Sequence, residues 1–234
     1  MKSANPIEIG QAVRAIVADE LALHRYRPAP NLLARIETFA ATLALWGSKL
    51  NLTSAPDDPG EIAFHVIDSL APLILANCPD ATALAKSFVA GSRVLDLGSG
   101  AGFPALLLAA ATDAQFVLLE ARRKRASFLS VAAAEMALTN VRVDSSRVES
   151  MTMAPSFDLV TARAFAEPSI VFETASAALK PDGRVILYAS PGQRSAIESA
   201  SVEAFQPAVF LDYEVPRGAQ RVAHMLAVAQ PRQH

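Results

Sequence analysis

The sequence predicts an α/β fold in which helices cover both faces of a mostly parallel sheet, behind an N-terminal helical cap. Two patterns predict it: apolar residues recur with helical spacing before residue 90, and short β-rich runs alternate with helical stretches after it. A third feature, the glycine-rich segment VLDLGSGAGFP at residues 94–104, indicates a ligand site, because glycine admits a close approach to the backbone. We expect residues 1–90 to form the cap and residues 91–234 the sheet domain, packed as one compact unit.

Three helices are expected in the cap. The first spans about residues 9–24 and the third about residues 59–76. Asp58 and Pro59 supply the cap and the first residue of the third helix, and Glu61 supplies the acid of a capping box. The second helix carries an apolar stripe with alternating spacings of four and three, which predicts a face turned to the core. The stripe consists of Leu32, Ile36, Phe39, Leu43, Trp46 and Leu50.

Five β-rich runs predict the parallel strands, and in chain order they are SRVLDL, QFVLLE, NVRVD, FDLVTA and GRVILYA. Helical stretches accompany them near residues 103–112, 122–138, 168–179 and 193–203. Two later runs, PAVFLDYEV and RVAHMLAVA, flank Pro216-Arg217-Gly218 and predict a closing pair of strands, which gives a seven-stranded sheet. Ligands of such sheets bind beyond the carboxyl ends of the strands, where Gly98 is expected to lie.

Composition limits the partners and the compartment. The formal net charge of -2 argues against a generally basic, nucleic-acid-binding surface, although a local basic patch can still serve that purpose. The single cysteine, Cys78, excludes an internal disulfide, and residues 1–10 lack the cationic-then-apolar pattern of an export signal. We therefore expect a protein of the reducing cytoplasm. The longest apolar runs, such as residues 106–111, are too short to cross a membrane, so no membrane contact is expected.

The glycine-rich segment has the pattern D-x-G-x-G-x-G, with Asp96 followed by Gly98, Gly100 and Gly102. A tight turn without a ligand needs only one of these glycines. A dinucleotide-binding fingerprint needs its third glycine where this chain has Phe103. The spacing resembles instead the first motif of the S-adenosylmethionine-dependent methyltransferases, in which bare backbone lies along the methionine and ribose of the cofactor. We therefore expect the three glycines to bind that cofactor.

A carboxylate at the end of the second predicted strand supports the same cofactor. Glu120 follows Gly98 by 22 residues, where its oxygens can accept hydrogen bonds from both ribose hydroxyls. Each feature alone is moderately specific, and the two together strongly favour S-adenosylmethionine.

The segment after the fourth predicted strand bears on the methyl acceptor. It reads FDLVTARAF, without the Asn or Asp, the two prolines and the aromatic residue that enzymes methylating exocyclic amines tend to carry. No carboxylate cluster has the spacing of metal ligands, so no metal is expected. Cys78 lies in the wrong part of the chain for the nucleophile of a carbon-methylating enzyme. These exclusions leave a methyl acceptor that is nucleophilic without activation.

Six segments occur in the order and spacing of the RsmG (GidB) family, the bacterial enzymes that methylate N7 of a guanine in 16S ribosomal RNA. They are Asn51-Leu52-Thr53, His65-Val66-Ile67-Asp68-Ser69-Leu70, GSGAGFP, LLEARRKRASFL, Ser146-Arg147-Val148-Glu149 and Ala162-Arg163-Ala164-Phe165. The resemblance implies a class I S-adenosylmethionine-dependent methyltransferase (Rossmann-like) fold, with residues 91–234 as the methyltransferase domain. It implies S-adenosylmethionine as the cofactor and 16S rRNA as the substrate, either naked or within the small ribosomal subunit or an assembly intermediate. It also implies that Gly98, Phe103, Val148, Glu149 and Arg163 bind the cofactor.

The implied reaction needs no general base, because N7 of guanine carries a free lone pair and no proton at neutral pH. Alignment and desolvation can supply about 7–11 kcal/mol of such a barrier. We expect Arg163 to contribute to catalysis by positioning, because it would hold either the methionine carboxylate or the guanine edge near the methyl group. The alternative is that Arg163 forms a structural salt bridge.

Four basic residues, Arg122, Arg123, Lys124 and Arg125, occupy the first turn of a predicted helix. The helix macrodipole disfavours cations there by about 0.3–1 kcal/mol each at low salt. Residues that depart from such a local structural preference often have a functional role. We expect them to bind phosphates of the substrate RNA. The alternative is a solvated helix start whose long side chains cover apolar neighbours.

Several alternatives stay open. His65 and Asp68 lie three residues apart on one face of the third predicted helix, so they either act together near the seam between cap and sheet or form a structural pair. Neither is assigned to catalysis. The chain could also be a methyltransferase for a protein or a small molecule, or an RNA-binding module that keeps only the fold. We expect a monomer.

Overall fold

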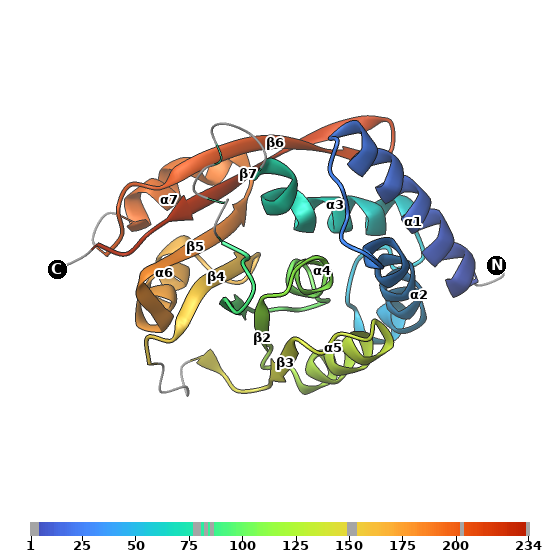
Figure 1. The fold of residues 1–234 in the computed structure, drawn as a ribbon, viewed down its shortest axis with the longest axis horizontal. Helices are drawn as coiled ribbons and strands as arrows, with labels where there is room; N and C mark the ends of the chain where they lie inside the picture. Colours follow the sequence, from blue (N-terminus) through green and yellow to red (C-terminus); the bar gives the residue numbers. More distant parts are fainter. Residues whose placement is uncertain are drawn as a thin grey trace.

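The computed structural model describes residues 5–76, 81, 84, 87–148, 154–201 and 204–232, with only the backbone of residue 48. The predicted cofactor residue Glu149 and the single cysteine, Cys78, lie outside the described residues. Within the described residues the chain forms the predicted α/β fold, a seven-stranded sheet with helices on both faces (Figure 1). No helix in this part of the chain is both long enough and apolar enough to cross a membrane.

The three predicted cap helices are confirmed as α1 (Pro6–Leu23), α2 (Leu32–Leu50) and α3 (Pro59–Leu75). α1 begins earlier than predicted, because Asn5 caps it by accepting a hydrogen bond from the N–H of Ile7 at 3.1 Å. The stripe on α2 forms core as predicted. Its fully buried members are Leu32, Ile36, Phe39 and Leu43, and the rings of Trp46 and the side chain of Leu50 pack against the same core.

α3 begins where the sequence predicts, but its third residue has a different partner. Asp58 accepts hydrogen bonds from the backbone N–H groups of Gly60 and Glu61, at 2.8 and 3.4 Å. The second half of the predicted capping box is wrong, because the Glu61 carboxylate accepts two hydrogen bonds from the Arg217 guanidinium, at 2.6 and 2.8 Å. A bidentate, charge-assisted pair is stronger than one bond to a backbone amide. This pair fastens α3 to the closing strands.

The seven strands are β1 (Arg93–Leu97), β2 (Gln115–Leu119), β3 (Val141–Asp144), β4 (Phe157–Arg163), β5 (Leu179–Ala189), β6 (Val209–Arg217) and β7 (Gln220–Ala229). Their order in the sheet is β3-β2-β1-β4-β5-β7-β6. The first five pair in parallel, whereas β7 pairs antiparallel with β5 and β6, which confirms the closing pair. Because β1 lies between β2 and β4, the segments that follow these three strands meet at one edge of the sheet.

The helices of the sheet are α4 (Ala105–Ala111), α5 (Arg123–Glu135), α6 (Pro168–Ala178) and α7 (Arg194–Ser201), with a 3-10 turn η3 (Pro191–Gln193) before α7. α4 begins later than predicted, because Gly102 has a φ of +91° and leaves Phe103 and Pro104 in the turn. α5 ends sooner than predicted, at Glu135, because Ala137 has a φ of +51° and cannot continue a helix.

The sheet separates two hydrophobic clusters, because alternate side chains of a strand point to opposite faces. Val94 belongs to the cluster that α1–α5 share, and the next residue, Leu95, belongs to the cluster that includes α6 and α7. Figure 1 shows α1 and α2 outermost on the first side, with α3 between them and the closing strands. The cap therefore packs on the same side of the sheet as α4 and α5.

Candidate active site

The glycine turn runs from Gly98 to Gly102 at the end of β1. Gly98, Gly100 and Gly102 have φ values of +68°, +53° and +91°, which favour glycine. Side chains of the protein fill two of the spaces: a Cβ on Gly98 would lie 2.4 Å from the Phe165 ring, and one on Gly102 would lie 2.6 Å from Leu106. Gly100 is more open, with the nearest atom at 3.7 Å. The turn is thus packed at both ends and accessible in its middle.

Glu120 joins the glycine turn to the start of α5. Its carboxylate is buried and accepts hydrogen bonds from the backbone N–H groups of Gly100 and Arg122, both at 2.9 Å. The N–H of Gly98 donates to the carbonyl of Leu119 at 2.9 Å, which holds the turn against the end of β2. An ionised carboxylate has about four acceptor sites, so about two are left for hydroxyl groups of a ligand.

A pocket of about 260 Å³ opens between the glycine turn, Glu120 and the ends of β3 and β4. Three predicted cofactor residues line it, namely Gly98, Glu120 and Val148. Phe103 packs elsewhere, against the rings of Phe39 and His65, with centroids 5.3 and 5.2 Å apart. The structure therefore brings part of the predicted cofactor set to one pocket and places Phe103 at the seam with the cap.

Seven lining residues were not predicted as cofactor residues, and three of them follow β3 and β4. Ser146, Ala164 and Phe165 also form walls of the pocket. Each belongs to a segment that carries the family resemblance, so the sequence did hold a signal for them. The contact of Phe165 with Gly98 depends on the chain path after β4, which local patterns do not specify.

Asp96, the acid of the glycine motif, is buried at the end of β1 with one unpaired oxygen. Its Oδ1 accepts a hydrogen bond from the Thr161 hydroxyl at 2.6 Å, whereas Oδ2 has no hydrogen-bond partner among the described residues. Burial raises the pKa of Asp96 to about 7, against the opposing effects of hydrogen bonds from Ser99 and Thr161 and of the charge on Arg163. A cationic ligand group at Oδ2 would stabilise the ionised carboxylate.

Replacing Asp96 with asparagine is expected to change how stability depends on pH between about 4 and 7. The folded pKa of this carboxyl lies above its unfolded value of about 3.9, so the folded state binds more protons across that window and wild-type stability falls as pH rises, on the order of 1 kcal/mol per unit. Asparagine carries no such proton. Urea unfolding should show that the free energy of unfolding of the variant, relative to that of the wild type, is higher at about pH 7 than at about pH 4.5. An equal difference at the two pH values would contradict the raised pKa.

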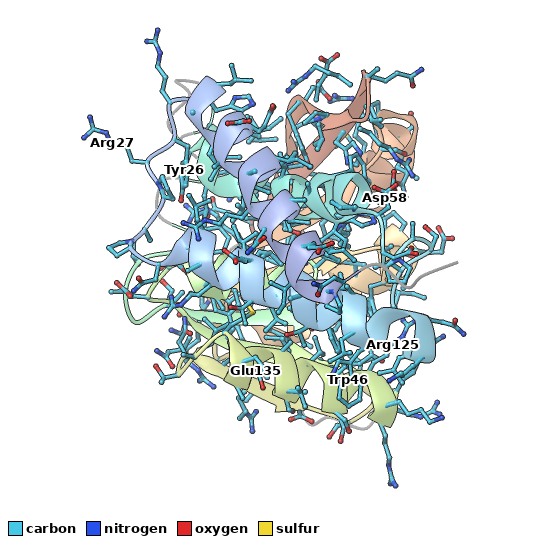
Figure 2. The ribbon with its side chains drawn as sticks, turned by 90° about the vertical axis from the view of Figure 1, so that its right-hand side faces the viewer. Tyr26, Arg27, Trp46, Asp58, Arg125 and Glu135 are labelled. Carbon is cyan, nitrogen blue, oxygen red and sulfur yellow. The ribbon has the colours of Figure 1, made fainter. Side chains whose placement is uncertain are left out.

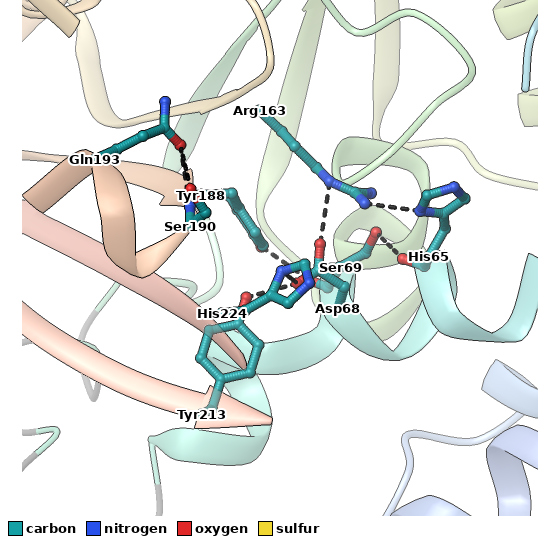
Figure 3. A network of polar contacts seen from close by, with 9 residues as sticks. All are labelled: His65, Asp68, Ser69, Arg163, Tyr188, Ser190, Gln193, Tyr213 and His224. Atoms are coloured by element: carbon teal, nitrogen blue, oxygen red, sulfur yellow. Dashed lines mark hydrogen bonds and ion pairs between the residues drawn. The ribbon is translucent and has the colours of Figure 1, made fainter. Parts of the chain in front are cut away.

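Arg163 ends β4 and points toward α3, where two side chains hold it (Figure 3). Its Nε lies 3.0 Å from Oδ2 of Asp68, and its Nη2 lies 2.7 Å from Nδ1 of His65. Its guanidinium carbon lies 5.7 Å from the centroid of the Phe103 ring. The predicted positioning residue is therefore held by protein groups at the seam between the glycine turn and the cap.

Asp68 is the centre of a buried network that joins α3 to three strands. Its Oδ1 accepts a hydrogen bond from the Tyr213 hydroxyl at 2.6 Å and lies 2.9 Å from Nδ1 of His224. Burial on its own would raise the pKa of this carboxyl, but the hydrogen bonds from His224 and Tyr213 and the charge of Arg163 outweigh burial and lower it. Asp68 is therefore ionised. Tyr213 and His224 were not predicted, because no local pattern reveals how the closing strands meet α3.

The basic cluster occupies the start of α5 as predicted, with Arg122 as the N-cap residue, and its members face different surroundings. Arg122 and Arg125 line the pocket, and Nη2 of Arg125 donates to the backbone carbonyl of Asn51 at 3.0 Å. Arg122, Arg123 and Lys124 are exposed. Arg123 and Lys124, which are not among the residues that line the pocket, are available at the surface beside it.

The family model described as "rRNA small subunit methyltransferase G" (GidB) matches residues 32–218. A relative from Sorangium cellulosum is 34% identical over 204 residues, which cover 86% of this chain and 76% of the relative. A relative from Shewanella loihica is 32% identical over 203 residues, which cover 86% of this chain and 90% of the relative. Both are named Ribosomal RNA small subunit methyltransferase G.

Solved structures of other methyltransferases share the fold. A SAM-dependent O-methyltransferase from Thermotoga maritima has a TM-score of 0.54 at 16% identity, covering 65% of this chain and 64% of that chain. A tRNA (m1A58) methyltransferase from Aquifex aeolicus has a TM-score of 0.54 at 14% identity, covering 72% and 69%. These likenesses show the class I methyltransferase fold alone, whereas the family model and the relatives extend over most of the sequence. The chain therefore belongs to the family of ribosomal RNA small subunit methyltransferases G.

Proposed function

We propose that this protein transfers the methyl group of S-adenosylmethionine to N7 of a guanine in 16S ribosomal RNA. The observation that carries the proposal is the pocket beside the glycine turn and Glu120, in a chain of this family. S-adenosylmethionine would supply an electrophilic methyl group on its sulfonium. In this proposal the protein is a monomer of the cytoplasm and acts on RNA of the small ribosomal subunit.

The residues present fit this cofactor. Glu120 lines the pocket and has acceptor sites to spare for the ribose hydroxyls, and the buried Oδ2 of Asp96 at the end of β1 has no hydrogen-bond partner among the described residues. Val148 and Phe165 offer apolar walls for the adenine. We propose that Gly98, Gly100, Gly102, Glu120, Val148 and Glu149 hold the cofactor at the pocket, and that Phe103 and Arg163 contribute from the seam between the glycine turn and the cap.

The proposed methyl transfer depends mainly on the alignment of the two reactants. Guanine N7 is nucleophilic without deprotonation, so the proposed role of Arg163 is to position a reacting group and not to exchange a proton. Its Nε and Nη2 are engaged by Asp68 and His65, whereas Nη1 has no hydrogen-bond partner among the described residues. Holding both reactants in one place can contribute about 7–11 kcal/mol to lowering the barrier.

The exposed cations at the start of α5 are expected to contact RNA phosphates. Replacing Arg123 and Lys124 with alanine should weaken binding to small-subunit RNA and lower the slope of log affinity against log salt by about 1.4–1.8, because each phosphate contact contributes about 0.7–0.9. A matched control replaces Arg25 and Arg27, which are exposed in the loop before α2, and Figure 2 shows Arg27 at the opposite end from Arg125. An equal slope change in both double variants would contradict an RNA site at α5.

One comparison tests the proposed function. Nucleosides from 16S rRNA of cells with and without the gene are separated and identified by mass spectrometry, and the purified protein is then incubated with S-adenosylmethionine and small subunits from the deleted strain. We expect 7-methylguanosine to be absent at one position in the deleted strain and to be restored by the protein. Identical nucleosides in both strains would contradict the proposal. A parallel reaction on naked 16S rRNA identifies which form is the substrate.

A further inference from the structure

The contact between Arg163 and His65 fixes the tautomer of the imidazole. A guanidinium can donate hydrogen bonds but cannot accept them. Because Nη2 of Arg163 lies 2.7 Å from Nδ1 of His65, Nδ1 must carry the lone pair and accept. The proton of the neutral ring is therefore on Nε2, which becomes a hydrogen-bond donor.

The surroundings keep His65 neutral. A proton on Nδ1 would face the N–H of Arg163, and burial together with the charge of Arg163 lowers the pKa of His65 to about 4. The imidazole lies 5.2 Å from the Phe103 ring, and the Arg163 guanidinium lies 5.7 Å from the same ring. Phe103 directly follows the glycine turn, so both side chains lie against a residue that adjoins that turn.

Two donors are presented together. In Figure 3 the second nitrogen of the His65 ring and the terminal nitrogen of Arg163 that makes no contact both lie on the side of the cluster away from Asp68. Asp68 meanwhile compensates the charge of Arg163 at 3.0 Å. The cluster of His65, Asp68 and Arg163 therefore offers hydrogen-bond donors without net charge.

Hydrogen-bond donors without net charge match the acceptor groups on the edge of a guanine that is methylated at N7. That edge presents O6 and N7 as acceptors, whereas adenine presents an amino donor in place of O6. N7 must keep its lone pair free, because that pair forms the bond to the methyl carbon while the S–C bonding pair leaves with sulfur. Positive charge passes to the base in this step, and an uncompensated cation beside the base would oppose it.

We propose that Nε2–H of His65 donates a hydrogen bond to O6 of the target guanine, so that His65 selects guanine over adenine and directs N7 toward the methyl group. This role rests on the proposed function. Arg163 fixes the tautomer and orientation of His65 in addition to its proposed contact with a reacting group, and Asp68 acts as a positioning residue because it holds Arg163.

Two variants of His65 separate the donor from the ring. His65→Phe keeps a ring against Phe103 and removes the donor, whereas His65→Gln keeps an amide oxygen for Arg163 and an N–H for the base. His24→Phe is the matched control, since His24 lies at the end of α1 and pairs with Glu20. For each variant, kcat and KM are measured on small subunits from the deleted strain, together with the S-adenosylmethionine affinity by calorimetry and the unfolding temperature.

We expect His65→Phe to lower kcat about 10- to 100-fold with little change in cofactor affinity, and His65→Gln to retain most of kcat. Small subunits reconstituted with 2-aminopurine at the methylated position keep N7 and lack O6. On these subunits the kcat of the wild type should fall by a similar factor, whereas the kcat of His65→Phe should be the same as on subunits with guanine. Should His65→Phe fail to fold, His65→Met, which also lacks a donor, replaces it.

The outcomes distinguish this role from the proposed function. If the wild type methylates small subunits and His65→Phe does so equally well, only the role of His65 is overturned. The same holds if the variant loses cofactor affinity as strongly as kcat, because His65 would then serve the cofactor, or if the losses from His65→Phe and 2-aminopurine multiply. Absence of methylation by the wild type overturns both proposals.

Discussion

Replacing Gly98 with alanine is expected to lower the affinity for S-adenosylmethionine about 10- to 100-fold and the free energy of unfolding by about 1–3 kcal/mol. The backbone at Gly98 has a φ of +68°, and the new Cβ would lie 2.4 Å from the Phe165 ring. Phe165 must move, and because it lines the pocket its displacement changes the space for the cofactor. Calorimetry and urea unfolding measure the two effects.

Gly218→Ala is the matched control for this substitution. Gly218 has a φ of +60°, and a Cβ there would meet nothing within 4 Å. It should therefore cost only the backbone strain of about 1–2 kcal/mol and leave cofactor affinity unchanged. Equal cofactor affinity in the Gly98 variant and this control would contradict the assignment of the glycine turn to the cofactor site.

Replacing Asp68 with asparagine is expected to cost about 3–5 kcal/mol of unfolding free energy near neutral pH, because it removes one partner of a buried ion pair. Asp68 is fully buried and faces donors from Arg163, Tyr213 and His224, so an amide would bring N–H groups against N–H or O–H groups. Methyl transfer should fall as well, since Arg163 would be left uncompensated beside His65. Urea unfolding and single-turnover methylation measure these losses.

Asp158→Asn serves as the control, because Asp158 pairs with Lys180 at 2.7 Å with its side chain 36% exposed, and such pairs contribute about 0–1 kcal/mol.

The pH dependence of stability gives a second check on Asp68. The folded pKa of Asp68 is lowered, so its stabilisation is present above the unfolded value of about 3.9 and is lost as pH falls through the folded value. The stability difference from the variant should therefore shrink in acid. A difference that stays constant below about pH 4 would contradict an ionised Asp68.

Local sequence patterns predicted the elements and the proximity of the glycine turn to Glu120 for a physical reason. Gly98 and Glu120 follow strands that pair side by side, so their proximity follows from the parallel topology alone. The ends of helices were less predictable where one residue takes a positive φ, as at Gly102 and Ala137. Neither conformation is visible in hydrophobic periodicity.

The network around Asp68 was beyond local patterns, because its partners come from distant parts of the chain. His65 and Arg163 are 98 residues apart, and Asp68 and Tyr213 are 145 residues apart. Their meeting depends on how α3 docks between β4 and the closing strands. The spacing of His65 and Asp68 indicated that they share a helix face, and only the fold shows which groups that face meets.

Calorimetric titration determines whether the pocket between the glycine turn and Glu120 holds S-adenosylmethionine. Glu120→Ala is compared with Glu135→Ala, an exposed residue at the far end of α5 (Figure 2). We expect one cofactor per wild-type chain, an affinity at least about tenfold weaker for Glu120→Ala, and no change for Glu135→Ala. Absence of binding heat with the folded wild type, or equal affinities in all three proteins, would contradict it.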